Sequence, residues 1–121
     1  MHATRFVTLS LTLFLALVCG AAIAHAHAYL DHASPLVGSV VIAPSEVRLW
    51  FTQTLEPRFS AAQLRSSSGA VVATGAVDPA NPKEMVIRVR ALPPGKYKVK
   101  WKILSVDTHR TEGDFGFEVR P

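Results

Sequence analysis

The sequence predicts an all-β protein, an immunoglobulin-like or cupredoxin-like Greek-key sandwich or barrel of about seven strands. Apolar and polar residues alternate with a period of two in several segments, which is typical of half-buried strands. Turn signals rich in proline, glycine and serine separate these segments at short intervals. No segment shows a helical period of apolar residues.

The strongest strand signal lies in the C-terminal half of the chain. Between residues 96 and 103, aromatic and aliphatic residues alternate with four lysines. The clear strand candidates, in chain order, are residues 47–52, 85–90, 96–103 and 115–119. Weaker candidates are residues 39–42, 61–66 and 70–76. The turn signals between them include Ser68-Gly69 and Pro93-Pro94-Gly95.

The N-terminal segment has the features of a secretory signal peptide. Arg5 precedes an apolar run over residues 6–18, and Ala24-His25-Ala26 has the small-residue pattern of a cleavage site. We therefore expect residues 1–26 to be a signal peptide and residues 27–121 to be one exported, periplasmic domain. A cut after Ala24, which would expose His25-Ala26-His27, and an uncleaved N-terminal anchor are the alternatives.

Composition excludes several classes of protein. The chain has 13 Lys and Arg, nine Asp and Glu, and a net charge of +4, which gives little reason to expect a nucleic-acid partner. Its one cysteine, Cys19, lies within the signal segment. The mature domain therefore has neither a disulfide nor the thiolate that a blue-copper electron-transfer site requires.

Three histidines remain after the signal segment, namely His27, His32 and His109. Asp107 and His109 are one residue apart, so on an extended segment their side chains project to the same side. A carboxylate and an imidazole on one face form a metal-binding pair if a further nitrogen donor joins them. The alternative is a solvated loop. After cleavage behind Ala26, His27 has a free α-amine as well as its imidazole, and the two groups can chelate one metal ion together.

The motifs of the mature chain resemble those of the CopC family of small exported copper-binding proteins. The resemblance covers essentially the whole mature chain, and its most specific parts are the histidine after the signal and the Ser-x-Asp-x-His stretch. The matching segments are His27-Ala28-Tyr29-Leu30, Ser34-Pro35, residues 47–51, residues 92–101, Ser105-Val106-Asp107-Thr108-His109 and residues 113–117.

The resemblance implies one Cu(II) ion per chain, held at the mature N-terminus. The amine and ring nitrogen of His27 form a histidine brace, His109 supplies the third nitrogen and Asp107 a carboxylate oxygen. Nitrogen and oxygen donors in a tetragonal arrangement favour Cu(II). The resemblance also implies a role in copper homeostasis or resistance, with a membrane copper transporter of the CopD type as partner. We expect a monomer, and the oligomeric state remains open. Resistance, storage and delivery remain open.

Two features depart from the family pattern. Many members have a methionine-rich loop for Cu(I), whereas residues 63–77 here contain no methionine, and we expect Met85 to pack in the core. Some members place a glutamate near the copper where this chain has Gln53. These differences predict a site for Cu(II) alone, with Asp107 as its acidic ligand.

Other polar and aromatic residues have simpler interpretations. We expect His32 to be a surface residue without a metal role and Trp101 to be a core aromatic. The lysines at positions 96, 98, 100 and 102 predict a solvated strand edge, or else a surface that docks an acidic partner or an anionic membrane.

Two other functions compete with copper binding and transfer. Histidine-brace copper monooxygenases use the same N-terminal chelate, but the small size, the carboxylate near the metal and the lack of an aromatic-rich loop argue against an enzyme. A metal-free immunoglobulin-like interaction module is the other alternative, and in that case the three ligands would not converge.

Overall fold

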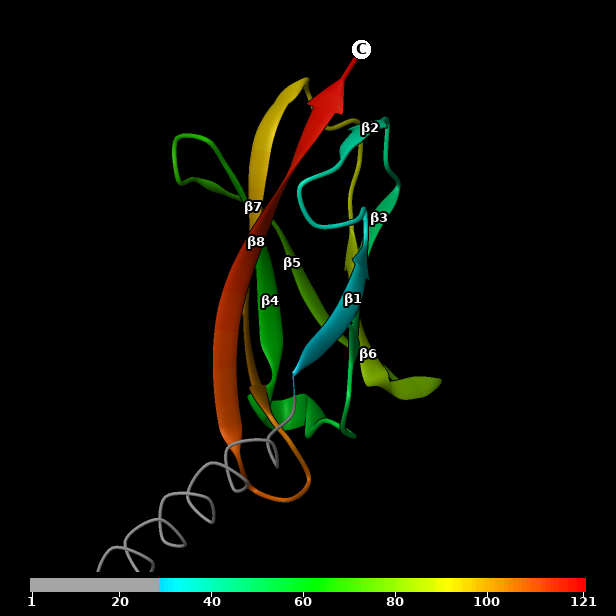
Figure 1. Cartoon of the computed structure of the whole chain (residues 1–121), viewed down its shortest axis with the longest axis vertical. Helices are drawn as coiled ribbons and strands as arrows, with labels where there is room; N and C mark the ends of the chain where they lie inside the picture. Colours follow the sequence, from blue (N-terminus) through cyan, green and yellow to red (C-terminus); the bar gives the residue numbers. More distant parts are fainter. Residues whose placement is uncertain (1–28) are drawn as a thin grey trace, which may run out of the picture.

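The computed structural model describes residues 29–121, which form a single curled sheet of eight strands (Figure 1). The predicted signal peptide, its cleavage site and His27 lie outside the described residues. The strands are β1 (Leu30–Ser34), β2 (Val40–Ile42), β3 (Glu46–Phe51), β4 (Ala61–Ser66), β5 (Val71–Asp78), β6 (Asn81–Arg88), β7 (Gly95–Leu104) and β8 (Arg110–Arg120), with one 3-10 turn, η1 (Pro57–Phe59), before β4.

The strand order in the sheet is β1-β3-β6-β5-β4-β7-β8-β2. Every neighbouring pair is antiparallel except β2 and β8, which are parallel. Figure 1 shows β4, β7 and β8 on one side and β1, β3 and β6 on the other, so the sheet curls around an interior. The all-β prediction is confirmed. In the part of the chain that the structure describes, no helix is long and apolar enough to cross a bilayer.

The sequence prediction assigned seven of these eight strands and missed β1. Of the five residues of β1 only Ala33 is buried, and Asp31, His32 and Ser34 are all exposed. The sequence of β1, Leu-Asp-His-Ala-Ser, contains no β-branched residue and does not alternate between apolar and polar residues. Its backbone pairing with β3, rather than its side-chain pattern, makes it a strand.

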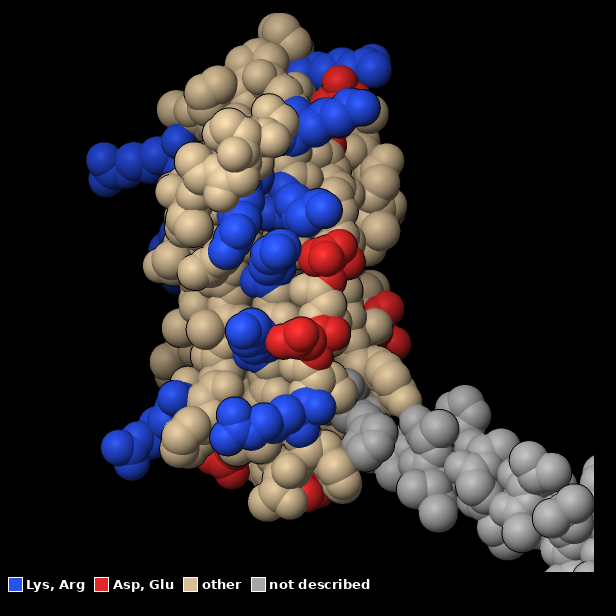
Figure 2. All heavy atoms as spheres, turned by 90° about the vertical axis from the view of Figure 1, so that its left-hand side faces the viewer, with Lys and Arg blue, Asp and Glu red and all other residues tan. Residues whose placement is uncertain are grey.

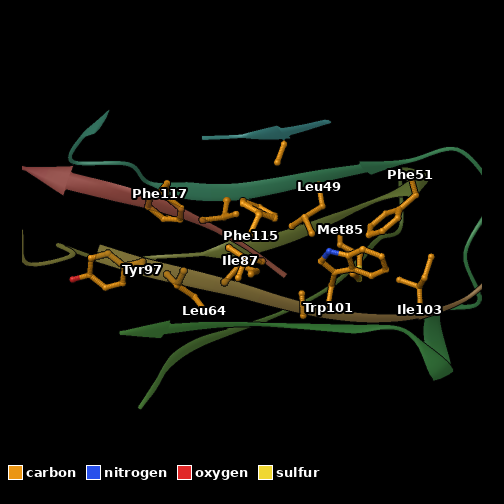
Figure 3. Packing of buried hydrophobic residues seen from close by; sticks show 14 of the residues in the cluster. Leu49, Phe51, Leu64, Met85, Ile87, Tyr97, Trp101, Ile103, Phe115 and Phe117 are labelled. Atoms are coloured by element: carbon orange, nitrogen blue, oxygen red, sulfur yellow. The ribbon is translucent and has the colours of Figure 1, made fainter. Parts of the chain in front are cut away.

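Alternating residues of the strands build one hydrophobic core. On β3, Leu49 is fully buried, and on β7 Val99 is fully buried as well. Figure 3 shows the labelled aromatic and aliphatic side chains pointing into the space between the strands. Met85 lies among them with no exposed surface, which confirms that it packs in the core.

Trp101 is the largest side chain of this core. It is 8% exposed, and its ring lies edge-on to Phe51 with 5.1 Å between centroids. Its cross-strand neighbour on β8 is Gly113, where an added Cβ would lie 2.6 Å from the indole Cζ2. The glycine leaves room for the indole ring, and the prediction that Trp101 is a core aromatic is confirmed.

The four lysines of β7 occupy a different position from the one the sequence indicated. β7 is hydrogen-bonded to β4 on one side and to β8 on the other, so it is not a strand edge. The lysines lie on the outer face of an interior strand, because their neighbours in the sequence fill the inner face. They therefore do not protect an unpaired backbone edge.

Candidate metal centre

The connection between β7 and β8 is a short, closed turn. The backbone N–H of Ser105 donates to the carbonyl of His109 at 3.0 Å, and the N–H of Thr108 donates to the carbonyl of Ser105 at 2.9 Å. Thr108 adopts a left-handed backbone conformation with φ of 71°. The segment is therefore not the extended one assumed from the sequence. Asp107 and His109 come together because the chain reverses between them.

The two predicted ligands of this turn are in contact. Oδ2 of Asp107 lies 3.4 Å from Nδ1 of His109, and the side chains are 39% and 46% exposed. Both side chains are therefore accessible to an ion from solvent. A histidine that ligates a metal commonly gives one ring nitrogen to a carboxylate and the other to the metal. Because Nδ1 lies beside Asp107, Nε2 is the ring nitrogen of His109 that would face a metal in such an arrangement.

Ser105 fixes the carboxylate of Asp107. Ser105 is fully buried and forms an isolated bridge with Leu55, which anchors the start of the turn to the body of the protein. Its hydroxyl donates to Oδ1 of Asp107. This hydrogen bond, and then the neighbouring His109, lowers the pKa of Asp107 below its ordinary value. At neutral pH the carboxylate is ionised, as metal binding requires.

The start of the described chain lies at the same end of the molecule as this turn (Figure 1). The N–H of Tyr29 donates to Oγ1 of Thr52 at 3.0 Å, and the N–H of Thr52 donates back to the carbonyl of Tyr29 at 3.0 Å. Two residues further along, the carbonyl of Thr54 accepts from the N–H of Val106 at 3.0 Å. The segment from Thr52 to Thr54 therefore holds both the beginning of the domain and the Asp107 turn.

His27 precedes Tyr29 by two residues and lies outside the described residues. Two residues of chain span at most about 7 Å. The predicted chelating residue is thus tethered within that length of Tyr29, whose backbone is fixed to Thr52.

His32 has its own partners on the outer surface. Its Nδ1 lies 2.6 Å from Oδ2 of Asp31, and its ring stacks on Trp50 with 4.3 Å between centroids. The side chain is 52% exposed. Gln53 is partly buried between the two threonines that hold Tyr29 and Val106.

Residues 29–121 contain no group of three or more His, Cys, Asp or Glu side chains that could hold a metal ion. What this range does bring together is the pair of Asp107 and His109. The nitrogen donors expected to complete the set belong to His27, beyond the described range.

Sequence reasoning missed the roles of three residues at this end of the molecule. Ser105 was visible as the first residue of the Ser-x-Asp-x-His stretch, but nothing in the spacing assigned its hydroxyl to Asp107. Thr52 and Thr54 gave no sequence signal, because their role depends on backbone pairing between segments far apart in the chain.

Comparisons with known proteins agree with this description. The family model of the CopC domain matches residues 30–120. Copper resistance protein C of Escherichia coli is 39% identical over 114 residues, covering 86% of this chain and 90% of that protein.

Two solved structures are similar throughout the domain. The crystal structure of CopC from Methylosinus trichosporium OB3b has a TM-score of 0.74 at 34% identity, covering 78% of this chain and 95% of that one. PcoC from Escherichia coli, described as a methionine-rich copper resistance protein, has a TM-score of 0.69 at 36% identity, covering 78% of this chain and 100% of that one. On the fold, the matched range and these identities, the chain belongs to the CopC family.

Proposed function

We propose that the exported form of this protein binds one Cu(II) ion in the periplasm and serves copper homeostasis or resistance. The ligands are the α-amine and ring of His27, the ring of His109 and the carboxylate of Asp107. Relatives named copper resistance protein C support the choice of metal.

The observation that carries this proposal is the contact between Asp107 and His109 in a turn fixed to the same segment as Tyr29. The two side chains are 3.4 Å apart, and the backbone bonds of Thr52 and Thr54 hold Tyr29 and Val106 at one end of the domain. A chelating N-terminus two residues before Tyr29 would lie within about 7 Å of Tyr29, at this same end of the domain.

The donor chemistry supports Cu(II) rather than Cu(I). Imidazole, amine and carboxylate donors suit Cu(II), whereas thiolates and thioethers favour Cu(I). The chain has two methionines, Met1 and Met85, and Met85 is fully buried in the core. The relative PcoC, by contrast, is described as methionine rich.

Binding in this arrangement depends on pH. The α-amine has an ordinary pKa of about 7.7–8.0 and must lose its proton before it can ligate. Asp107 needs no such step, because its pKa is already lowered. Affinity for Cu(II) therefore falls as pH drops below the amine pKa, because protons compete with the metal for the amine.

We propose a binding role without catalysis, in which the protein sequesters Cu(II) or delivers it to a membrane copper transporter of the CopD type. A histidine-brace monooxygenase would oxidise a polysaccharide when copper and a reductant are present. Product analysis of the copper-loaded protein with ascorbate tests this directly, and we expect no oxidised product.

Native mass spectrometry of the exported protein, with and without Cu(II), tests the proposal. We expect the mass of residues 27–121 and one added copper ion, with a nitrogen-rich tetragonal signal in electron paramagnetic resonance. A protein that begins at His25, or one that binds no copper after a cut behind Ala26, would contradict the ligand set.

A further inference from the structure

The outer face of β7 contains a groove rich in positive charge. The groove has a volume of about 760 Å³, within the size range of ligand-binding clefts. Its charged lining comprises Arg65, Lys96, Lys98 and Lys100, against the single carboxylate of Glu118. Figure 2 shows lysine and arginine side chains gathered at mid-height on this face, with acidic side chains along only one side of them.

The cross-strand neighbours of Lys98 leave its charge uncompensated. On β8 it faces Gly116, and on β4 it faces Arg65. Like charges directly opposite each other on a sheet are destabilising. Among residues 29–121, Arg65 donates to the amide oxygen of Gln63, at 3.3 Å from Nε and 2.9 Å from Nη2. This pair of cations therefore costs the folded state some stability.

Elsewhere on the sheet, on β3, a partly buried arginine is surrounded by carboxylates that neutralise its charge. Arg48 on β3 lies 2.9 Å from Asp78 and 3.2 Å from Glu84, with Glu46 at 3.5 Å. Across residues 29–121, the only β7 lysine with a carboxylate within 4 Å is Lys102, which lies 3.9 Å from Glu112. Glu118, the carboxylate nearest in register to Lys96, contacts Arg120 at 3.7 Å.

Two walls make the charged surface concave. On one side is the turn between β4 and β5, closed by the N–H of Gly69 donating to the carbonyl of Ser66 at 2.9 Å. Gly69 has φ of 87°, a conformation that glycine adopts without steric cost. On the other side is the loop before β2, where Val37 is 60% exposed. Figure 1 shows the β4–β5 turn projecting away from the body of the domain.

The spacing of the cations matches an extended chain. Lys96, Lys98 and Lys100 alternate with buried residues, so they are two residues apart on one face of β7. Two residues of a strand rise about 6.6 Å. An extended segment with acidic residues at every second position presents carboxylates with the same period.

We propose that this groove docks an extended acidic segment of a protein partner, with carboxylates at alternate positions over Lys96, Lys98 and Lys100 and beside Arg65. The inference goes beyond the copper site and does not depend on it. The groove offers about 760 Å³ between its walls to such a segment. A flat membrane meets the projecting β4–β5 turn first and is held away from the groove floor.

Fluorescence anisotropy with a labelled peptide of alternating Glu and Ser tests the proposal on the exported protein. We expect saturable binding that weakens with salt, because the pairs are exposed to screening. An isomeric peptide with its glutamates contiguous should bind more weakly. Vesicles of phosphatidylglycerol should bind less than the peptide does.

Charge-reversal variants locate the binding. Lys98→Glu and Arg65→Glu should each weaken peptide binding by about fivefold, since the loss of an exposed ion pair worth about 1 kcal/mol changes the affinity by that factor. Lys83→Glu makes the same change in net charge on β6, outside the groove, and should have little effect. Thermal unfolding confirms that each variant is folded.

Three results would overturn the proposal. One is equal loss of binding in Lys83→Glu and Lys98→Glu, which would indicate a general charge effect. Another is equal binding of the alternating and contiguous peptides, which would contradict the match in spacing. The third is vesicle binding that Lys98→Glu abolishes while the peptide does not bind, which would assign the face to a membrane.

Discussion

The β7–β8 hairpin contains two regions with opposite character. Along the paired strands, Val99 and Trp101 are buried and their backbones are hydrogen-bonded. In the connection between the strands, Asp107 and His109 are 39% and 46% exposed and contact each other. The paired strands stabilise the folded state, and the turn between them contains the candidate metal ligands. Ser105, fully buried at the junction, belongs to both regions.

Because the core residues and the candidate ligands lie in different parts of the hairpin, we expect that substitutions can change the free energy of unfolding and the affinity for copper separately. A change in the paired strands should lower the free energy of unfolding without removing a ligand. A change in the turn should remove a ligand without creating a cavity.

Trp101→Ala should have the largest effect on stability. Truncating a buried aromatic side chain costs about 3–5 kcal/mol of unfolding free energy, and Trp101 is 8% exposed. Urea unfolding of the copper-free protein measures the loss. Trp50→Ala is the matched control, because Trp50 lies on the outer face against His32 and should cost less. Equal losses would show that the outer ring contributes as much to stability as the inner one.

His109→Ala should have the largest effect on copper binding among single changes in the turn. The half-exposed ring contributes a predicted ligand but little packing, so Cu(II) affinity should fall more than about tenfold while the unfolding temperature changes little. Competition with a chelator measures the affinity. His32→Ala is the control and should leave binding nearly unchanged. Equal losses in the two variants would mean that the ligands are misassigned.

Ser105→Ala should raise the pKa of Asp107, because the hydroxyl hydrogen bond is the main cause of its lowered value. In the unaltered protein this bond stabilises the folded state above the ordinary carboxyl pKa of 3.8, and the contribution is lost as pH falls through the lower folded pKa. Nuclear magnetic resonance titration of the carboxyl carbon follows the shift.

Ser60→Ala is the matched control for that experiment. Ser60 is also a buried serine, 6% exposed, but its hydroxyl is bonded to the backbone of Leu104 rather than to Asp107. The pKa of Asp107 should stay unchanged in this variant. A shift of the same size in both would indicate that general loosening of the turn, and not the hydroxyl of Ser105, sets the pKa.

Met85→Leu should have the smallest effect. A hydrophobic replacement of similar volume in a core costs less than about 1.5 kcal/mol, and Met85 is fully buried. Copper binding in both oxidation states should be unchanged, as measured by titration with and without reductant. A loss of Cu(I) binding would show that the thioether is a ligand after all.

The sequence predicted the strands wherever one face of the strand is buried. β7 was readable because its apolar residues alternate without interruption, and β4 was placed at residues 61–66, where the structure has it. β1 was missed because its sequence, Leu-Asp-His-Ala-Ser, has no β-branched residue, whereas β2 and β5, with no and one buried residue, were found through their valines. The place of β7 within the sheet was also missed, since strand order depends on pairing between distant segments.

The candidate site was predictable as a set of residue types but not as a geometry. The one-residue separation of Asp107 and His109 suggested a shared face on an extended segment, whereas the structure brings them together through a turn with a left-handed Thr108. The role of Ser105 requires knowing that its side chain is buried beneath the turn. Spacing alone contains neither fact.

The central claim is that the free N-terminus of His27 is a copper ligand together with Asp107 and His109. Adding one residue ahead of His27 in the exported protein tests it most directly, because the α-amine then becomes a peptide nitrogen while every side chain is kept. We predict that the extended protein loses most of its affinity for Cu(II) in a chelator competition. Equal affinity of the extended and natural proteins would contradict the claim.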